Sequence, residues 1–372
     1  MFPALHARAA RDKGIDMDVD WGTDFFVSIG NMLGYSRVNM GFKTALSKLG
    51  VNLNGHGSVS IQVCYPEKYF PVPGRANVLI TMFESEDLPD FFVESLNKAD
   101  AIVVPSEYCG RVFQRYTDVP VHVVPLGIDH SIFHFFERVR EPNRPFRWLW
   151  TGARNPRKGW REVIWAWDLG KDGERYRDRQ DCELFLKTLG DDNNLRRNGN
   201  VITCTQAVSD EDMARIYADA DGFIFPTQGE GFGWTAAEAM ATGLPCVMPL
   251  HTGMLDWADE TTCVPLPYET GGYGVMSTHG GGTCPIPLLT VKVEDVRDRM
   301  DWVMNHPEEV KEIARRGAER VQKYTWESAG RMLLDILRQL ETGNPGFAAE
   351  EIDHGNTPAG SQDFSAGESR DS

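Results

Sequence analysis

The chain has 372 residues, of which 41% are hydrophobic and 25% are charged, and its formal net charge is −16. This length is too great for one hydrophobic core, so we expect two domains. The acidic balance disfavours a nucleic-acid partner, because nonspecific binding to nucleic acids needs clustered cations. The longest apolar runs are far shorter than the ~20 residues of a membrane-spanning helix, and the N-terminal stretch is too acidic for a signal peptide. These features predict a cytoplasmic protein.

The seven cysteines are scattered and form no CxxC pair. Most of them lie in apolar surroundings, which favours buried free thiols over disulfides or zinc ligands. The cysteines are Cys64, Cys109, Cys182, Cys204, Cys246, Cys263 and Cys284.

Apolar runs and helical periods alternate through the first part of the chain. This alternation predicts a parallel sheet with helices on both faces. Strands are predicted at 25–30, 51–53, 77–83, 101–106 and 121–129, and helices at 41–50, 91–99 and 107–116. We assign residues 1–138 to the first domain.

The stretch HFFERVREPNRP (134–145) is polar and interrupted by prolines, so residues 139–145 are predicted to be a linker. The strand and helix pattern then restarts and predicts a second doubly wound α/β domain over 146–324. Its strands are predicted at 146–153, 182–190, 200–205, 222–227 and 244–250, and its helices at 159–170, 209–220, 234–243, 293–305 and 307–324. Residues 343–372 are rich in Gly, Ser, Pro and acids, which predicts a disordered acidic tail.

The stretch PTQGEGFGWTAAEAMATGLPCV (226–247) places Glu230 in a glycine-rich loop and Glu238 one turn inside the next helix. Gly231 and Gly233 allow a positive φ or a close approach of the backbone to a ligand. The N–H groups at a helix start attract anions, which predicts a phosphate over Gly233, Trp234 and Thr235.

Carboxylates accept hydrogen bonds from sugar hydroxyls but are poor phosphate ligands. An anion site between two glutamates therefore suggests a sugar nucleotide. Taken alone, two glutamates at this spacing are common by chance, and Glu238 could be an ordinary helical residue.

The same stretch closely resembles the E-x7-E signature of the retaining GT-B glycosyltransferases of family 4. GARNPRKGW (152–160), VVPSEYCGRVF, VHVVPLGIDHSIF and YTWESAGRMLLDIL resemble further segments of that family in the same order. The likeness covers most of residues 24–340 and is looser in the first third. It implies two Rossmann-like domains facing across a cleft, with a closing helix at 325–342 that returns to the first domain.

The resemblance implies that Glu230 contacts the hydroxyls of the donor sugar and that Glu238 binds the ribose. It assigns Lys158 to the diphosphate, together with an arginine whose usual position is Ala153 here. Either Arg154 or Arg157 replaces that arginine. We name Glu230, Lys158 and Arg154 as candidate catalytic residues. The candidate donor-binding residues are Gly34, Gly152, Arg157, Thr227, Gly231, Phe232, Gly233, Trp234, Thr235 and Glu238.

The segment IGNMLGYSRVNMG is predicted to be the first strand-to-helix loop, and the resemblance implies that it lies near the donor phosphate and the acceptor. Tyr35, Ser36, Glu84 and Ser85 are the candidates for the acceptor side, while His56 is interpreted as a solvated turn residue.

We predict no metal and no cofactor, because fixed cations and helix dipoles can meet the charge of a departing diphosphate. The DxD triplets at 16–20 and 219–221 are interpreted as structural, with the first one preceding the fold. The donor is expected to be a UDP or GDP sugar.

Two alternatives remain open at the sequence level: a nucleotide-sugar epimerase of the same architecture, and a degenerate scaffold that binds sugar nucleotides without turnover. The acceptor is not readable. A protein, glycan or small molecule is favoured over a nucleic acid.

Overall fold

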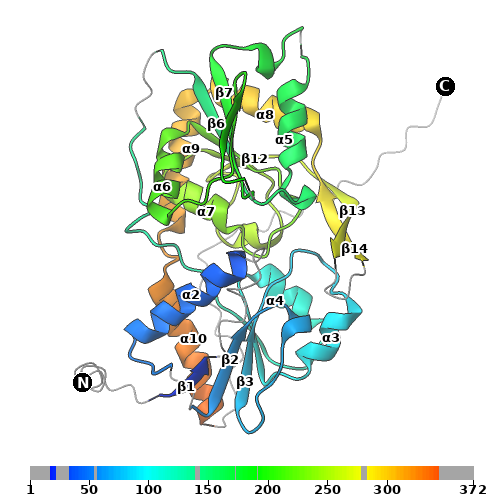
Figure 1. Ribbon diagram of the computed structural model, residues 1–372, viewed down its shortest axis with the longest axis vertical. Coiled ribbons are helices and arrows are strands. Elements are labelled where there is room, and N and C mark those ends of the chain that lie inside the picture. The colour runs from blue at the N-terminus through cyan, green and yellow to red at the C-terminus, as the bar shows by residue number, and fades with distance from the viewer. Residues whose placement is uncertain are drawn as a thin grey trace, which may run out of the picture.

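The computed structural model describes residues 17–21, 33–53, 57–138, 143–171, 173–190, 192–277 and 283–342 (Figure 1). The strand expected at 25–30, His56 and the tail at 343–372 lie outside the described residues. The described chain forms two α/β units, one above the other in Figure 1, and each is built on a parallel sheet.

The first sheet has five parallel strands in the order β1-β2-β3-β4-β5. Its inner strand β4 is buried along its whole length, as expected of a parallel sheet covered on both faces. The strands are β1 (Val19–Trp21), β2 (Val59–Val63), β3 (Ala76–Ile80), β4 (Ala101–Val104) and β5 (Val121–Val123). The helices are α2 (Leu33–Lys48), α3 (Asp90–Leu96) and α4 (Glu107–Gln114), with the 3-10 turn η1 (Pro66–Lys68).

The start of this unit differs from expectation. The first DxD triplet does not precede the fold, because its residues from 17 onward run into β1 at the edge of the sheet. Asp18 accepts a hydrogen bond from Asn52 at 2.6 Å, and Asp20 pairs with Arg75 at 2.5 Å. Both carboxylates therefore have structural partners. The strand predicted at 51–53 is reduced to a bridge at Asn52, and β2 was not predicted.

The second sheet has seven strands in the order β12-β11-β10-β6-β7-β9-β8. All its pairs are parallel except β8 with β9. The strands are β6 (Phe146–Thr151), β7 (Cys182–Lys187), β8 (Leu195–Asn198), β9 (Val201–Cys204), β10 (Gly222–Ile224), β11 (Cys246–Met248) and β12 (Val264–Pro265). The sequence gives no sign of β8, since its four residues are all exposed and carry no apolar alternation.

The helices of the second unit follow the predicted order. Ser209 caps α6 as its residue type suggests, accepting a hydrogen bond from the Asp212 N–H at 3.1 Å. The helices are α5 (Trp160–Asp168), α6 (Asp210–Asp219), α7 (Trp234–Ala241), α8 (Val293–Asn305) and α9 (Pro307–Val321). Three 3-10 turns accompany them: η2 (Pro156–Lys158), η3 (Tyr176–Asp178) and η4 (Thr252–Asp256).

Helix α10 (Trp326–Glu341) returns from the second unit to the first, where it packs on α2 (Figure 1). The two helices approach so closely that a Cβ on Gly330 would lie 2.6 Å from the Cβ of Ala45. The return expected of residues 325–342 is therefore present.

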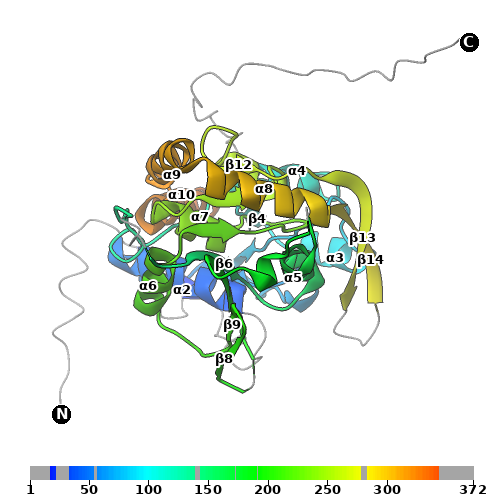
Figure 2. The ribbon, with the colours of Figure 1, turned by 90° about the horizontal axis from the view of Figure 1, so that it is seen from above.

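An arm made of β13 (Glu269–Ser277) and β14 (Thr283–Thr290) leaves the second unit and lies beside α3 of the first (Figure 2). Ile286 and Leu288 of this arm are each 7% exposed and join the apolar cluster around Phe83 and Phe92. Ser85 adds a hydrogen bond to the carbonyl oxygen of Pro287 at 2.7 Å. This arm was not predicted, because its apolar partners belong to the other domain.

The cysteines are free thiols, as predicted, with six buried and Cys284 partly exposed. Among the described helices, none is both long and apolar enough to cross a membrane.

Candidate active site

The loop between β10 and α7 holds Glu230 against the first domain. A Cβ on Gly229 would lie 2.4 Å from the carbonyl oxygen of Glu84, and one on Gly231 would lie 3.0 Å from the Cβ of Met82. Glycine therefore lets this loop touch the opposite domain.

Gly233 is the residue before α7 and has a φ of 83°, a conformation that favours glycine. A Cβ there would also lie 2.7 Å from Met254 Cγ. The helix begins at Trp234, as predicted. The Ala236 N–H donates to the carbonyl oxygen of Gly233 at 3.0 Å, and the N–H groups of Trp234 and Thr235 precede this first intrahelical bond. This end of α7 is suited to an anion.

Glu230 is 5% exposed and is surrounded by donors. Lys158 Nζ lies 2.6 and 2.8 Å from its two carboxylate oxygens, and Arg157 Nη1 lies 3.2 Å from Oε1. Thr227 Oγ1 donates a further hydrogen bond at 2.8 Å. Burial disfavours the charged carboxylate, but Lys158 and Arg157 outweigh it, so the pKa of Glu230 lies below its ordinary value.

The two cations are positioned by the short turn η2. The Asn155 side chain accepts a hydrogen bond from the Arg157 N–H at 3.0 Å. Gly159 ends the turn with a φ of 70°, where a Cβ would lie 2.1 Å from the carbonyl oxygen of Pro226. Arg157 Nη2 also reaches Glu84 of the first domain at 2.9 Å, so this guanidinium joins carboxylates from both domains.

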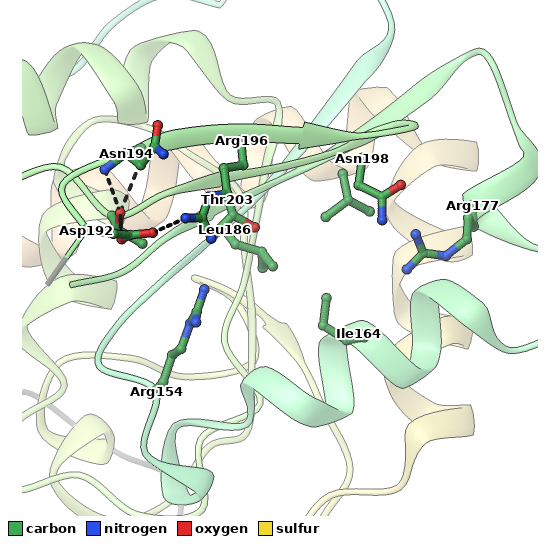
Figure 3. Close-up of a pocket in the computed structure, with 11 residues that line it drawn as sticks. Arg154, Ile164, Arg177, Leu186, Asp192, Asn194, Arg196, Asn198 and Thr203 are labelled. Carbon is green, nitrogen blue, oxygen red and sulfur yellow. Dashed lines mark hydrogen bonds and ion pairs between the residues drawn. The ribbon is translucent and has the colours of Figure 1, made fainter. Parts of the chain in front are cut away.

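Arg154 lies elsewhere. It lines a pocket of about 340 Å³ between the β8–β9 strands and α5 (Figure 3). Two other arginines of this pocket are already paired, Arg177 with Asp168 and Arg196 with Asp192. The contacts of Glu230 involve Arg157 and not Arg154. The structure thus places Arg157, and not Arg154, beside Lys158 and Glu230.

His251, which sequence reasoning missed, completes a ring of hydrogen bonds around Glu230. The Glu230 N–H donates to Thr252 Oγ1 at 3.0 Å, and that hydroxyl lies 3.0 Å from His251 Nδ1. His251 Nε2 lies 3.0 Å from the carbonyl oxygen of Thr227, whose hydroxyl returns to the Glu230 carboxylate. Burial lowers the pKa of His251 to about 4, so the imidazole is neutral near pH 7. A single histidine between a strand and a turn gives no sequence signal of this role.

Glu238 is 1% exposed and is not an ordinary solvated helical residue. Its Oε1 accepts from Arg37 Nη2 at 2.6 Å, whereas its buried Oε2 has no hydrogen-bond partner among the described residues. Burial raises the pKa of Glu238, and Arg37 opposes that rise. Arg37 belongs to α2 of the first domain and was not predicted. Its only signal was its position in the segment around Gly34.

Residues between Glu230 and Glu238 also make packing contacts and hydrogen bonds within the protein. Phe232 is buried, and its carbonyl oxygen accepts from Trp257 Nε1 at 2.7 Å. The carbonyl oxygen of Thr235 accepts from Tyr217 at 3.0 Å. The Trp234 ring lies 4.3 Å from the guanidinium carbon of Arg37.

We expected Gly34, Tyr35 and Ser36 in a loop. The structure instead places all three in the first turn of α2. Tyr35 is buried, and its hydroxyl donates to the carbonyl oxygen of Met82 at 2.9 Å. Its contacts are structural. Gly34 is exposed, and a Cβ there would meet no atom of the described residues within 4 Å. Ser36 is half-buried.

Of the two candidates after β3, only one faces the Glu230 cluster. Glu84 pairs with Arg157, while the buried Ser85 hydroxyl is bound to the β14 backbone. Gly152 follows β6, and its N–H donates to the carbonyl oxygen of Lys187 at 3.1 Å.

A family model described as family 4 glycosyltransferase in conflict systems matches residues 193–333. The MMP α-(1→4)-mannosyltransferase of Mycolicibacterium hassiacum is 27% identical over 228 residues, which are 59% of this chain and 48% of that protein. The chain therefore spans about half the length of this curated relative.

Two solved structures share the fold. Sucrose-phosphate synthase from Thermosynechococcus elongatus gives a TM-score of 0.57 at 16% identity, over 83% of this chain and 79% of that one. Anabaena HepE, solved in complex with UDP-glucose, gives a TM-score of 0.56 at 12% identity, over 81% and 82%. The architecture is thus that of the GT-B glycosyltransferases. Over residues 193–333 the chain is also similar to the family 4 glycosyltransferases.

Proposed function

We propose that this chain is a retaining glycosyltransferase that moves a sugar from a nucleoside diphosphate to an acceptor bound between the two domains. The observation that carries the proposal is the contrast between two buried glutamates. Glu230 is held by Lys158 and Arg157, whereas Glu238 keeps an unpartnered carboxylate oxygen. A ligand with a diphosphate next to a ribose would satisfy both environments.

In this proposal the diphosphate lies at the N-terminus of α7, within reach of Lys158 and Arg157. These cations stabilise the negative charge that develops as the bond from the sugar carbon to the diphosphate oxygen breaks. Glu230, freed from part of its pairing, accepts hydrogen bonds from the donor sugar, and Glu238 Oε2 accepts from the ribose. The acceptor oxygen attacks on the face that the diphosphate leaves, and its proton passes to the departing phosphate.

Glu84 supports an acceptor site on the side of the first domain. Glu84 lies in the loop after β3, and its carboxylate is 2.9 Å from Arg157, with 17% of the side chain exposed. A carboxylate in this position can accept a hydrogen bond from an acceptor hydroxyl. We propose a protein, glycan or small molecule as the acceptor, and a UDP or GDP sugar as the donor with no cofactor.

The first test is a thermal-shift screen of the purified chain with UDP, GDP, ADP, CDP and their sugars. A ligand at 100 times its dissociation constant should add about 2.7 kcal/mol to the free energy of unfolding. We expect one nucleotide family to raise the melting temperature, Glu238→Ala to lose the gain from the free nucleotide, and Glu230→Ala to lose mainly the additional gain from the sugar.

Product analysis separates the alternatives. A transferase consumes the donor only when an acceptor is supplied, apart from slow hydrolysis. Conversion of the donor alone to another nucleotide sugar would identify an epimerase, and binding without any turnover would identify a scaffold. Absence of any nucleotide-dependent shift would contradict the proposal.

A further inference from the structure

Arg37 reaches from the first domain into the nucleotide side of the second. It lies on α2, and its guanidinium contacts three residues of the opposite domain. Nη2 lies 2.6 Å from Glu238 and 3.2 Å from Asp210, and the guanidinium carbon lies 4.3 Å from the Trp234 ring centre. These contacts hold the planar group in one orientation over the start of α7.

Arg37 and the two carboxylates that it contacts differ in how deeply they are buried. The Glu238 side chain is 1% exposed, whereas those of Arg37 and Asp210 are 33% and 48% exposed. A buried carboxylate is costly unless a cation and hydrogen bonds compensate for it. The titratable groups that face Glu238 are Arg37 from α2 and Asp210 and Tyr217 from α6. Of these, Arg37 alone favours the charged form.

Arg37 satisfies one oxygen of Glu238 and leaves the other without a partner among the described residues. A carboxylate held in this way presents its second oxygen as an acceptor, which a ribose hydroxyl needs. A protonated carboxyl would offer a weaker acceptor.

We propose that Arg37 is a positioning residue that keeps Glu238 ionised and oriented for the nucleotide, so that the nucleotide site is complete only when the first domain is closed on the second. This inference rests on the proposed function. It explains why an arginine of the first domain pairs with a glutamate of the second, and it links nucleotide affinity to domain closure.

The test compares wild type with Arg37→Met, Arg37→Lys and the control Ser85→Ala, in which a cross-domain hydrogen bond of the β14 arm is removed. The dissociation constants of UDP and GDP are measured by calorimetry at pH 8, 7 and 6, and far-ultraviolet circular dichroism checks folding. Without Arg37, Glu238 is expected to protonate at a higher pH. Arg37→Met should therefore bind the nucleotide more weakly at pH 6 than at pH 8, by up to about tenfold for each unit of pH over which Glu238 takes up its proton.

Wild type, Arg37→Lys and Ser85→Ala should show a much smaller dependence on pH, since a cation remains beside Glu238 in each. Equal affinity of wild type and Arg37→Met at every pH would overturn the inference alone. The inference would also be overturned if Arg37→Met and Ser85→Ala lost nucleotide affinity equally and by the same factor at every pH. That pattern would describe a general contact between the domains. A wild type that binds neither UDP nor GDP would overturn the inference together with the proposed function.

Discussion

Two glutamates of one motif acquire opposite properties from their neighbours. Both are buried, but the pKa of Glu230 falls beside Lys158 and Arg157, whereas the pKa of Glu238 rises because burial exceeds the effect of Arg37. The first is held as an anion between cations, whereas the second keeps one carboxylate oxygen without a hydrogen-bond partner among the described residues. Residue type alone does not distinguish them.

His251 provides a prediction for stability at the residue scale. Its pKa is lowered from 6.5 to about 4 in the folded chain, so the unfolded chain takes up the proton first as the pH falls. Stability from this group is therefore complete above pH 6.5 and is lost between pH 6.5 and 4. From pH 7.5 to 5 we expect a loss of about 2 kcal/mol in the free energy of unfolding.

Urea denaturation at both pH values measures this loss. His251→Gln should be less stable than wild type at pH 7.5 but should lose less on acidification. His134→Gln, at an exposed position, is the matched substitution. If His251→Gln keeps the full pH dependence of wild type, the neutral buried imidazole is not its source.

At the scale of elements, the β13–β14 arm joins the two domains beside the Glu230 loop. Leu288 lies within 3.6 Å of where a Gly229 Cβ would be, and it packs with the apolar cluster of the first domain. The Leu289 N–H also donates to the carbonyl oxygen of Gln228 at 3.1 Å. The arm therefore contacts both the core of one domain and the Glu230 loop of the other.

Leu288→Ala should remove much of this contact. Leucine-to-alanine changes in buried positions cost about 2–5 kcal/mol in the free energy of unfolding, and we expect a loss in that range by urea denaturation. Tyr273→Ser on the same arm, where the side chain is 76% exposed, should change stability by less than about 0.5 kcal/mol. Equal effects of the two substitutions would show that the arm is not packed as described.

At the scale of the whole molecule, the domains meet through contacts that surround the candidate site. Besides the Arg37–Glu238 and Arg157–Glu84 pairs, Ser106 donates to the carbonyl oxygen of Gly231 at 2.7 Å. The Glu107 N–H donates to Asp256 at 2.8 Å. Residues of both domains therefore hold the candidate site together, and under the proposed function this packing would also exclude water from a bound donor.

Gly229→Ala tests this coupling, because its Cβ would lie 2.4 Å from the carbonyl oxygen of Glu84 and the backbone has little freedom to move. We expect the substitution to separate the domains and raise the radius of gyration in small-angle X-ray scattering. Turnover of the donor should fall by about 100-fold, as for misplaced catalytic groups.

Gly170→Ala is the control, since its nearest atom would be a side-chain carbon at 3.8 Å. Unchanged scattering and turnover in Gly229→Ala would contradict the requirement for this close approach.

Much of the architecture could be predicted from local pattern. The apolar runs of β3, β4, β6 and β10 and the periodic helices α8 to α10 lie where the sequence places them. Strands that lack such runs were missed: β8 is fully exposed, and the β13–β14 arm obtains its apolar contacts from the other domain. The start of α2 was also misplaced, because its glycine suggested a loop.

The sequence by itself determined two α/β domains, the glycine-rich loop with Glu230, the helix with Glu238 and the neighbouring Lys158, since these depend on residue type and spacing along one segment. Only the tertiary structure distinguished Arg157 from Arg154, brought Glu84 and Arg37 across the cleft, and closed the ring through His251. Those contacts join residues 70 or more positions apart in the chain for Arg157 and about 200 apart for Arg37. The contacts of Arg37 and Glu84 originate in the packing of one domain on the other, and the ring through His251 originates in the packing of loops within the second domain. No local pattern encodes either.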